Sequence, residues 1–329
     1  MFYAPKFIDR WLRSRDVIGP ETSISPLTRR SGLAPVEWFV DAQRGSDTSD
    51  GRDPRSPKAT LATLIGNGAS SLANSGDTVY VVGNVTEEIT GYNLLEDISI
   101  IGVANRPRHA DKARDYATYA YKGISGASWR EAASHGATTP LLTIRGQGWY
   151  IENILFVPPS DAAAIYLERN ALSNISEFDA SHLQVRGCRF AGGSVGIQDV
   201  GGGFGVHLYD NVFQSNTHGI RGTSTSVDVP TQWHLRGNVF MDCTNSLIVS
   251  AKQWLIMDNV FGKFTTTSVD LINLSAQGSN NEVHGNYLSG DYDAKYIPSS
   301  TDEWAGNYSM DVGSAEVGAE GLTTAIPVA

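Results

Sequence analysis

Two copies of the segment DNVF place an aspartate directly before an asparagine, at Asp210 and Asp258. Carboxylates in pairs can cut a glycosidic bond, which needs two carboxyl groups about 5 to 9.5 Å apart. Asp199 and Asp242 are further carboxylates of the same stretch. An aspartate beside an asparagine also suits a tight turn, because both side chains hydrogen-bond to nearby backbone. The turn role is the stronger interpretation, so we assign no catalytic residue and no metal ligand.

Aromatic, imidazole and apolar side chains recur just before these asparagines and could bind a partner. Tryptophan, tyrosine and histidine combine an apolar body with a polar edge, which suits stacking on sugar rings. Exposed leucine and methionine on a flat sheet indicate cover by a partner or a loop. The candidates are His207, Tyr209, Trp233, His234, Trp254, Leu255 and Met257. Three interpretations stay open: contact with another subunit, cover by an insertion at 102–148, and glycan binding.

The candidates belong to an internal repeat. The segments DNVF, GNVF, DNVF, GNYL and GNY follow one another at spacings of 27, 21, 27 and 21 residues. RGCRFAG places Cys188 in the asparagine slot, and IENILF is a looser copy around Asn153. A period in the twenties indicates stacked supersecondary units. The repeated asparagines are Asn211, Asn238, Asn259, Asn286 and Asn307.

Two apolar columns accompany the asparagines, and their neighbours vary in polarity, as in short strands with one buried face. We therefore expect each repeat to wrap once and pair with the next at about 4.8 Å, as an all-β, single-stranded right-handed parallel β-helix. The asparagines would form a hydrogen-bonded structural ladder. The columns hold Val185, Leu208, Leu235, Ile256 and Val283 before the asparagine, Phe190, Phe213, Phe240, Phe261 and Leu288 after it, and Ile197, Ile220, Ile248 and Ile272 in a further register.

The stretch from Trp38 to Glu88 carries a loop with Asp41, Gly45, Ser46, Asp47, Asp50 and Gly51, then an Ala/Leu-rich segment, then GDTVYV. It resembles the entrance segment of the pectin-lyase-like β-helix superfamily. The resemblance implies a first strand, a loop, a short helix within 60–73 that caps the coil, and a strand that starts the first turn. It covers residues 38 to 310 and concerns the fold alone, since enzymes and bacteriophage spikes share this entrance.

The motifs of the superfamily's enzymes are incomplete in this sequence. Mannuronan epimerases carry Asp-Pro-His, where this chain has DPR at Asp53. Polygalacturonases carry Asn-Thr-Asp-Gly, where this chain has NTHG with His218 in the position of the carboxylate. A polysaccharide lyase or glycoside hydrolase therefore stands as the alternative function, with a site shared between chains as one way to build it.

Charge and composition bound the function. A formal net charge of −10 over 329 residues gives the body no electrostatic reason to bind nucleic acid or an anionic membrane. The sequence offers neither a signal-peptide core nor a stretch that could insert into a membrane. Cys188 and Cys243 are expected to be reduced and structural. We expect no cofactor.

The first 35 residues differ chemically from the rest, with six Lys and Arg against three Asp and Glu, a net charge of +3. Phe7, Ile8, Trp11 and Leu12 form the apolar face expected of a short helix that folds on something else. Docking to a larger assembly, clasping of the same trimer and binding to an anionic membrane stay open. The expected domains are an arm and tether (1–35), a β-helix body (36–310, with entrance and cap at 36–90, an insertion at 102–148 and repeats at 149–310) and a tail (311–329).

A β-helix with a separate docking arm and no enzymatic signature resembles bacteriophage spike and virion-appendage proteins. The resemblance implies a homotrimeric tail or head spike, located in the virion and attached by its N-terminus. Its partners would be copies of itself, other virion proteins bound through residues 1–35, and host surface polysaccharide. A bacterial surface adhesin is a weaker third interpretation.

Overall fold

The computed structural model describes most of the body of the chain. The docking candidates Phe7, Ile8, Trp11 and Leu12 lie outside the described residues, as do all other residues up to 34. The described residues are 35–66, 71–91, 95–103, 127–131, 137–168, 180–201, 203–222, 229–262, 271–274, 279–289, 296–309 and 321–323.

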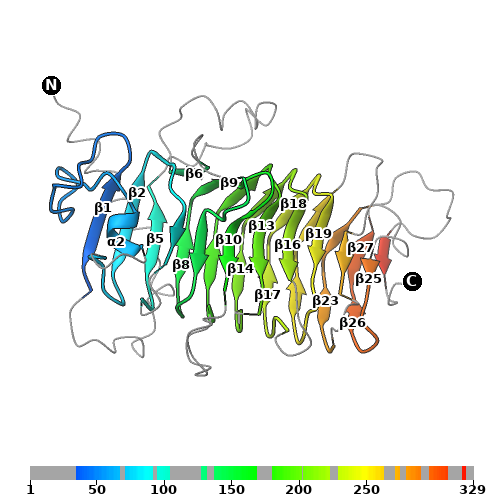
Figure 1. The fold of residues 1–329 in the computed structure, drawn as a ribbon. Helices are drawn as coiled ribbons and strands as arrows, with labels where there is room; N and C mark the ends of the chain where they lie inside the picture. Colours follow the sequence, from blue (N-terminus) through cyan, green and yellow to red (C-terminus); the bar gives the residue numbers. More distant parts are fainter. Residues whose placement is uncertain are drawn as a thin grey trace.

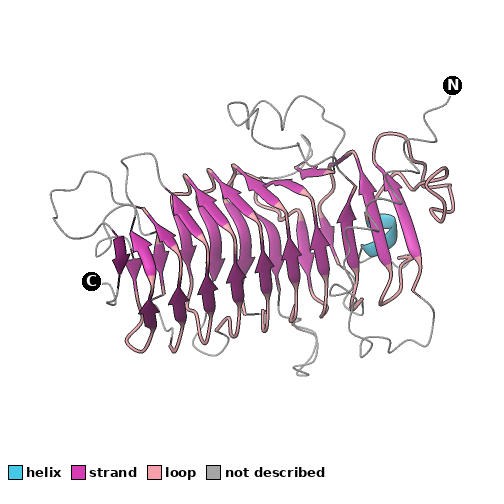
Figure 2. Cartoon of the chain, turned by 180° about the vertical axis from the view of Figure 1, so that it is seen from behind, coloured by secondary structure: helices cyan, strands magenta, loops and turns pink. Residues whose placement is uncertain are grey.

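Three long sheets run along one axis, and the chain visits them in turn (Figures 1 and 2). Sheet A is 10-stranded: β1 (Glu37–Asp41), β2 (Thr78–Val82), β5 (Ser99–Gly102), β8 (Tyr150–Glu152), β11 (Gln184–Arg186), β14 (His207–Tyr209), β17 (His234–Arg236), β20 (Leu255–Met257), β23 (Glu282–His284) and β26 (Glu303–Ala305). Sheet B is 10-stranded: β3 (Asn84–Val85), β6 (Ser128–Arg130), β9 (Leu155–Val157), β12 (Arg189–Ala191), β15 (Val212–Gln214), β18 (Val239–Met241), β21 (Val260–Gly262), β24 (Tyr287–Leu288), β27 (Asn307–Ser309) and β28 (Gly321–Thr323). Sheet C is 8-stranded: β4 (Ile89–Thr90), β7 (Leu142–Ile144), β10 (Ala163–Leu167), β13 (Val195–Asp199), β16 (His218–Gly222), β19 (Asn245–Ile248), β22 (Ile272–Asn273) and β25 (Tyr296–Ile297).

Neighbouring strands pair in parallel, except β27 with β28, which are antiparallel. From β2 to β25, each turn of the chain therefore adds one strand to each sheet, and the predicted parallel β-helix is confirmed. Like residues stand over like: Leu208 pairs with Leu235, and Phe213 pairs with Phe240. One column differs from the prediction, because Ile220 pairs with Leu247 and not with Ile248.

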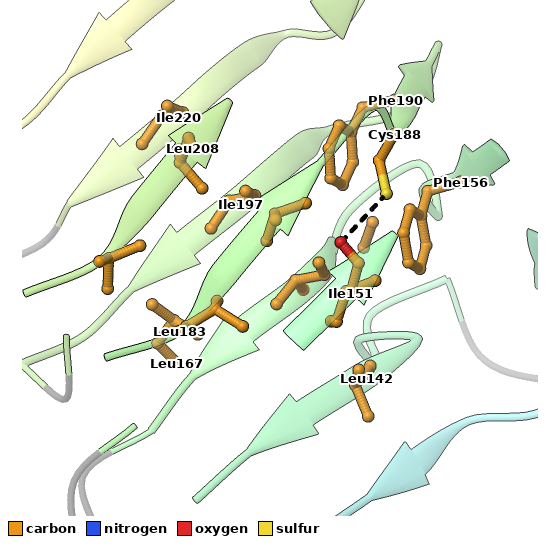
Figure 3. Close-up of a cluster of buried hydrophobic side chains, with 14 of the residues drawn as sticks. Leu142, Ile151, Phe156, Leu167, Leu183, Cys188, Phe190, Ile197, Leu208 and Ile220 are labelled. Carbon is orange, nitrogen blue, oxygen red and sulfur yellow. Dashed lines mark hydrogen bonds between the residues drawn. The ribbon is translucent and has the colours of Figure 1, made fainter. Parts of the chain in front are cut away.

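The phenylalanines behind sheet B form a continuous stack in the core. From Phe156 to Phe261, successive ring centroids lie 4.7–5.1 Å apart and successive planes are within 8° of parallel. Figure 3 shows Phe156 and Phe190 pointing into the interior with the aliphatic side chains of the other sheets. Each buried ring stabilises the fold by about 1.5–3 kcal/mol.

The repeated asparagines form a buried ladder at the corner between sheets A and B. From Asn238 onward, each Oδ1 accepts hydrogen bonds from the backbone N–H and the Nδ2 of the asparagine one coil earlier, at 2.9–3.1 Å. Each Nδ2 also donates to a backbone carbonyl, as Asn238 does to Leu208 O at 2.8 Å. The members are Asn211, Asn238, Asn259, Asn286 and Asn307, all fully buried.

Cys188 occupies the first position of this column. Its backbone N–H donates to Asn211 Oδ1 at 2.9 Å, and its thiol lies 3.8 Å from Ile151 O, the contact dashed in Figure 3. Asn153 does not share the column, although the sequence placed it there. Asn153 has a φ of 60° and aligns with Gly187. The residue that aligns with Cys188, in the asparagine column, is therefore Ile154.

A short helix, α2 (Ala62–Ile65), lies at the start of the coil, with Leu61 and Leu64 fully buried in the core. The two carboxylate oxygens of Glu87 accept the backbone N–H groups of Leu61 and Ala62 at 2.8 Å, which satisfies donors that a helix start leaves unpaired. The helix is shorter than the 60–73 span considered for it, because the backbone is already extended at Gly66.

Strands β6 and β7 lie inside the range 102–148, which the sequence indicated as an insertion. They pair with β9 and β10, so residues 128–130 and 142–144 belong to the coil. Over the described ranges, no helical segment has the length and hydropathy that crossing a lipid bilayer requires.

Candidate functional site

The outer face of sheet A carries five of the predicted side chains in two rows. The register of β14, β17 and β20 aligns His207 with His234 and Leu255. Tyr209 shares the second row with Met257, two coils further on. All five are half-buried and alternate with core residues, so the structure brings these candidates together on one outer surface.

The two histidines of this surface contact each other. The ring centroids of His207 and His234 lie 4.7 Å apart, and His207 Nδ1 is 2.7 Å from Tyr209 Oη. Burial, with smaller contributions from His234 and His182, lowers the pKa of His207 to about 4. His207 is therefore neutral at neutral pH and serves as a hydrogen-bonding, not a charged, group.

The two tryptophans lie inside the coil, so their assignment to the outer face was wrong. Trp233 and Trp254 are 0% and 1% exposed. Their Nε1 atoms donate to Gly203 O and Pro230 O, each at 2.9 Å. Because side chains alternate along a strand, Trp233 points to the same side as the core residue Leu235. The alternation of side chains along each strand was the sequence signal that could have placed the two tryptophans in the core.

Asp210 and Asp258 hold turns, as the turn interpretation expected. Both have a left-handed backbone, with φ of 56° and 55°, and Asp242 has a φ of 53°. The Asp258 carboxylate lies 3.2 Å from the guanidinium of Arg236 on the exposed surface. A left-handed turn position accounts for these aspartates without a catalytic role.

Asp199, Asp53 and His218 also have local structural explanations. Asp199 is fully buried and accepts the backbone N–H of Gly203 at 3.1 and 3.2 Å. Asp53 accepts the backbone N–H two residues later at 2.7 Å, in an exposed turn. His218 begins β16, and burial lowers its pKa. The segment NTHG, residues 216–219, which contains His218, has no carboxylate.

A pocket of about 340 Å³ lies on the outer face of sheet C, away from the predicted side chains. The register places Tyr166 between Thr143 and Gln198, on β10, β7 and β13. Most of the lining comes from two adjacent coils, those of β7 and β10. The pocket is therefore elongated along these strands and not across the sheet. Sequence reasoning missed it. The available signal was Tyr166 directly after the core residue Ile165, which predicts a side chain on the outer face.

We call this pocket the sheet C pocket. An ion pair lies at one end of it. Arg145 Nε lies 2.6 Å from Glu168 Oε2, with the two side chains 25% and 33% exposed. The two residues directly follow β7 and β10, so the pair joins neighbouring coils. Burial, with a smaller contribution from Glu168, raises the pKa of Tyr166, which keeps its hydroxyl protonated. The pocket thus offers a ring, a phenol donor and an ordered guanidinium.

The carboxylates of the pocket are poorly spaced for glycosidic bond hydrolysis. Asp161 precedes β10 and Glu168 follows it. At about 3.3 Å per residue, the five steps from Ala163 to Glu168 cover about 16 Å of backbone, beyond the 5 to 9.5 Å that a hydrolytic pair requires. Across the described part of the chain, no group of three or more His, Cys, Asp and Glu side chains could hold a metal ion. The arrangement is suited to binding.

Two solved structures resemble this chain over most of its length. Pectate lyase Bsp165PelA from Bacillus sp. N165, in complex with trigalacturonate, matches with a TM-score of 0.51 and 14% identity, over 88% of this chain and 89% of the lyase. Pectate lyase Pel9A matches with a TM-score of 0.51 and 13% identity, over 88% of this chain and 79% of the lyase. The fold is a pectate-lyase-like parallel β-helix. At this identity the likeness concerns the fold, and the sequence matches no protein-family model and no curated protein.

Proposed function

We propose that this chain is a structural protein of a virus particle, a homotrimeric tail or head spike attached by its N-terminus, whose body binds a glycan of the host surface. The glycan part rests on the sheet C pocket, where the ring of Tyr166 lies among hydrogen-bonding side chains such as Gln198 and Arg145. A sugar has apolar ring faces and polar hydroxyls, and this combination of side chains complements both.

Two features support the spike part. The coil is a rod whose long faces give identical copies room to pack side by side, and half-buried Leu255 and Met257 lie on the outer face of sheet A. The first 35 residues carry a net charge of +3, whereas the whole chain carries −10. A basic segment whose sequence predicts an apolar helical face is suited to docking on another protein of the particle.

The glycan part is tested by binding of surface polysaccharides to the full chain, with Tyr166→Ala and Tyr166→Phe as matched variants. Loss of the ring is expected to weaken binding about 2- to 10-fold, the value of an aromatic contact, whereas the phenylalanine variant keeps the ring and most of the affinity. Unchanged binding by Tyr166→Ala would place the glycan elsewhere on the molecule.

The spike part is tested by light scattering and by particle assembly. Light scattering of the purified protein is expected to give a molar mass three times the 35.4 kDa of one chain. Deletion of residues 1–35 is expected to abolish incorporation into particles while the coil stays folded. Retention of the truncated chain on particles would contradict attachment through the arm.

The alternative is a polysaccharide lyase or glycoside hydrolase, favoured by the fold that this chain shares with two pectate lyases. Incubation with polysaccharides distinguishes the two functions. A monomer that releases unsaturated or reducing ends would establish the enzyme, and a trimer without such activity would support the spike.

A further inference from the structure

The outer face of sheet B carries an uncharged strip along the second half of the coil. The strands from β15 to β24 bury a phenylalanine or leucine in the core, so the neighbours of that residue point outward. The strip begins after β12, whose Arg189 guanidinium donates to Gln214. We call it the sheet B strip, and its two rows hold Val212, Val239, Val260, Tyr287 and Tyr308, and Gln214, Met241 and Gly262.

Two exposed aromatic side chains end the strip. Tyr287 and Tyr308 are 49% and 46% exposed, and they are two of the four exposed large hydrophobic side chains of the described residues. Their ring centroids lie 5.7 Å apart, so the two rings form one patch. The buried cores of protein interfaces are enriched in tyrosine and methionine and depleted of charged side chains. The sheet B strip has this composition, which indicates a surface that another protein covers.

The other two faces carry charge in the same coils. On sheet A, the exposed side chains include Arg236, Glu282 and Glu303. On sheet C, Arg221 is exposed in the row that continues to Ile248. Among the faces that the structure describes, only sheet B therefore offers successive coils from β15 to β27 without a charged side chain.

Rotational symmetry explains why one face of a spike would lack charge. In a homotrimer whose coils lie side by side, a side chain next to the threefold axis meets its own copies, so a charge there meets a like charge. Further from the axis, different residues of the two copies face each other, and opposite charges can pair. The chain carries a net charge of −10, so its copies repel one another overall and can approach closely only at a neutral surface.

We propose that the sheet B strip lies against the threefold axis of the trimer, where the same strip of the other two copies covers it. This inference rests on the homotrimer of the proposed function and names the surface that forms it. Half-buried Leu255 and Met257 lie on sheet A, across the asparagine corner from the strip. At that position they face different residues of the next copy, as side chains away from the axis do.

Charge substitutions in the full chain test the placement of the strip. Val239→Glu puts three carboxylates around the axis, and it is expected to raise the concentration at which the trimer dissociates by about 100-fold or more. Ile248→Glu is the matched control, because Ile248 is a half-buried aliphatic side chain on the outer face of sheet C in the same coil. The control is expected to keep the molar mass of three chains. Light scattering over a dilution series measures the mass, and circular dichroism shows that both variants are folded.

A mixture of oppositely charged variants separates contact from misfolding. Val239→Lys alone is expected to dissociate the trimer as Val239→Glu does. An equal mixture of the two folded variants is expected to recover species of higher mass, because unlike charges then meet at the axis. Recovery requires residue 239 of one copy to face residue 239 of another. Folded variants that stay monomeric in the mixture would overturn the placement of the strip at the axis.

The outcomes distinguish the strip from the trimer itself. An unchanged protein that is monomeric would count against the trimer and the strip together. A Val239→Glu trimer as stable as that of the control would overturn the role of the strip alone, and so would equal dissociation of the control. Should a stable Val239→Glu trimer fail to enter particles, the strip would instead be the contact with another particle protein, which also contradicts the inference.

Discussion

Trp233 and Trp254 lie face to face inside the coil, with ring centroids 4.6 Å apart and planes 4° from parallel. In the next coil Asn281 occupies the same column, one residue before a strand of sheet A, and its Nδ2 donates to Ala251 O at 3.0 Å. Each of the three side chains thus donates to a backbone carbonyl of an earlier coil. At this corner of the coil, a side-chain N–H pairs with a buried backbone carbonyl in each turn. Tryptophan supplies the donor in two turns and asparagine in the third.

Replacing Trp254 tests this corner. Trp254→Ala removes a fully buried ring and leaves Pro230 O without its indole donor, so we expect the free energy of unfolding to fall by about 3–5 kcal/mol. Leu255→Ala is the matched control on the next residue, which is half-buried on the outer face, with an expected loss of about 1 kcal/mol. Denaturation in urea measures both. Similar losses for the two variants would contradict the inward placement of the tryptophan.

The asparagine ladder predicts that two buried asparagines differ in how much they contribute to stability. Asn238→Ala removes the donor to Leu208 O and the acceptor for Asn211, which leaves several buried polar groups unpaired. We expect a loss of about 3 kcal/mol or more in the free energy of unfolding. Asn245 is a buried control outside the ladder, because its Oδ1 has no hydrogen-bond partner among the residues that the structure describes. Asn245→Ala is expected to cost less than half as much, and the reverse order would contradict the ladder's contribution.

The cysteines predict slow thiol chemistry in the folded protein. Cys188 and Cys243 are buried, and their thiols face the backbone carbonyls of Ile151 and Phe213. Ellman's reagent is expected to modify both only after unfolding in denaturant, which is also the control for reagent access. Rapid modification of the native protein would mean that the coil opens at these positions.

The sequence predicted the columns of the coil because self-similarity along the chain becomes contact in space. Phe213 recurs at Phe240 and therefore packs on it. The same logic failed for Trp233, whose polar edge suggested a surface role although alternation along the strand placed it beside the core. For this residue, periodicity indicates the buried position and residue chemistry does not.

The sheet C pocket could not be predicted in the same way. Thr143, Tyr166 and Gln198 lie side by side, but they differ in type and are 23 and 32 residues apart. Unequal spacing and unlike residues leave no column to find in the sequence. The pocket also depends on Arg145 and Glu168, whose pairing follows from the register of two strands before the clear repeats begin.

His207 predicts how stability depends on pH. Its pKa in the folded protein is about 4, below the ordinary value of 6.5, because burial and the neighbouring His234 and His182 disfavour its charged form. As the pH falls, the unfolded chain therefore takes up this proton before the folded chain does. The stability that neutral His207 provides is complete above about pH 6.5 and is lost progressively as the pH falls toward 4.

His207→Gln removes this titration and keeps a polar side chain beside Tyr209. Between pH 7 and pH 4, we expect the free energy of unfolding of the variant to decrease less than that of the unchanged protein. Urea denaturation at a series of pH values measures the difference, and an NMR titration of the His207 ring locates its midpoint directly. A midpoint at the ordinary value, or an unchanged pH dependence in the variant, would show that the outer face of sheet A leaves this histidine fully solvated.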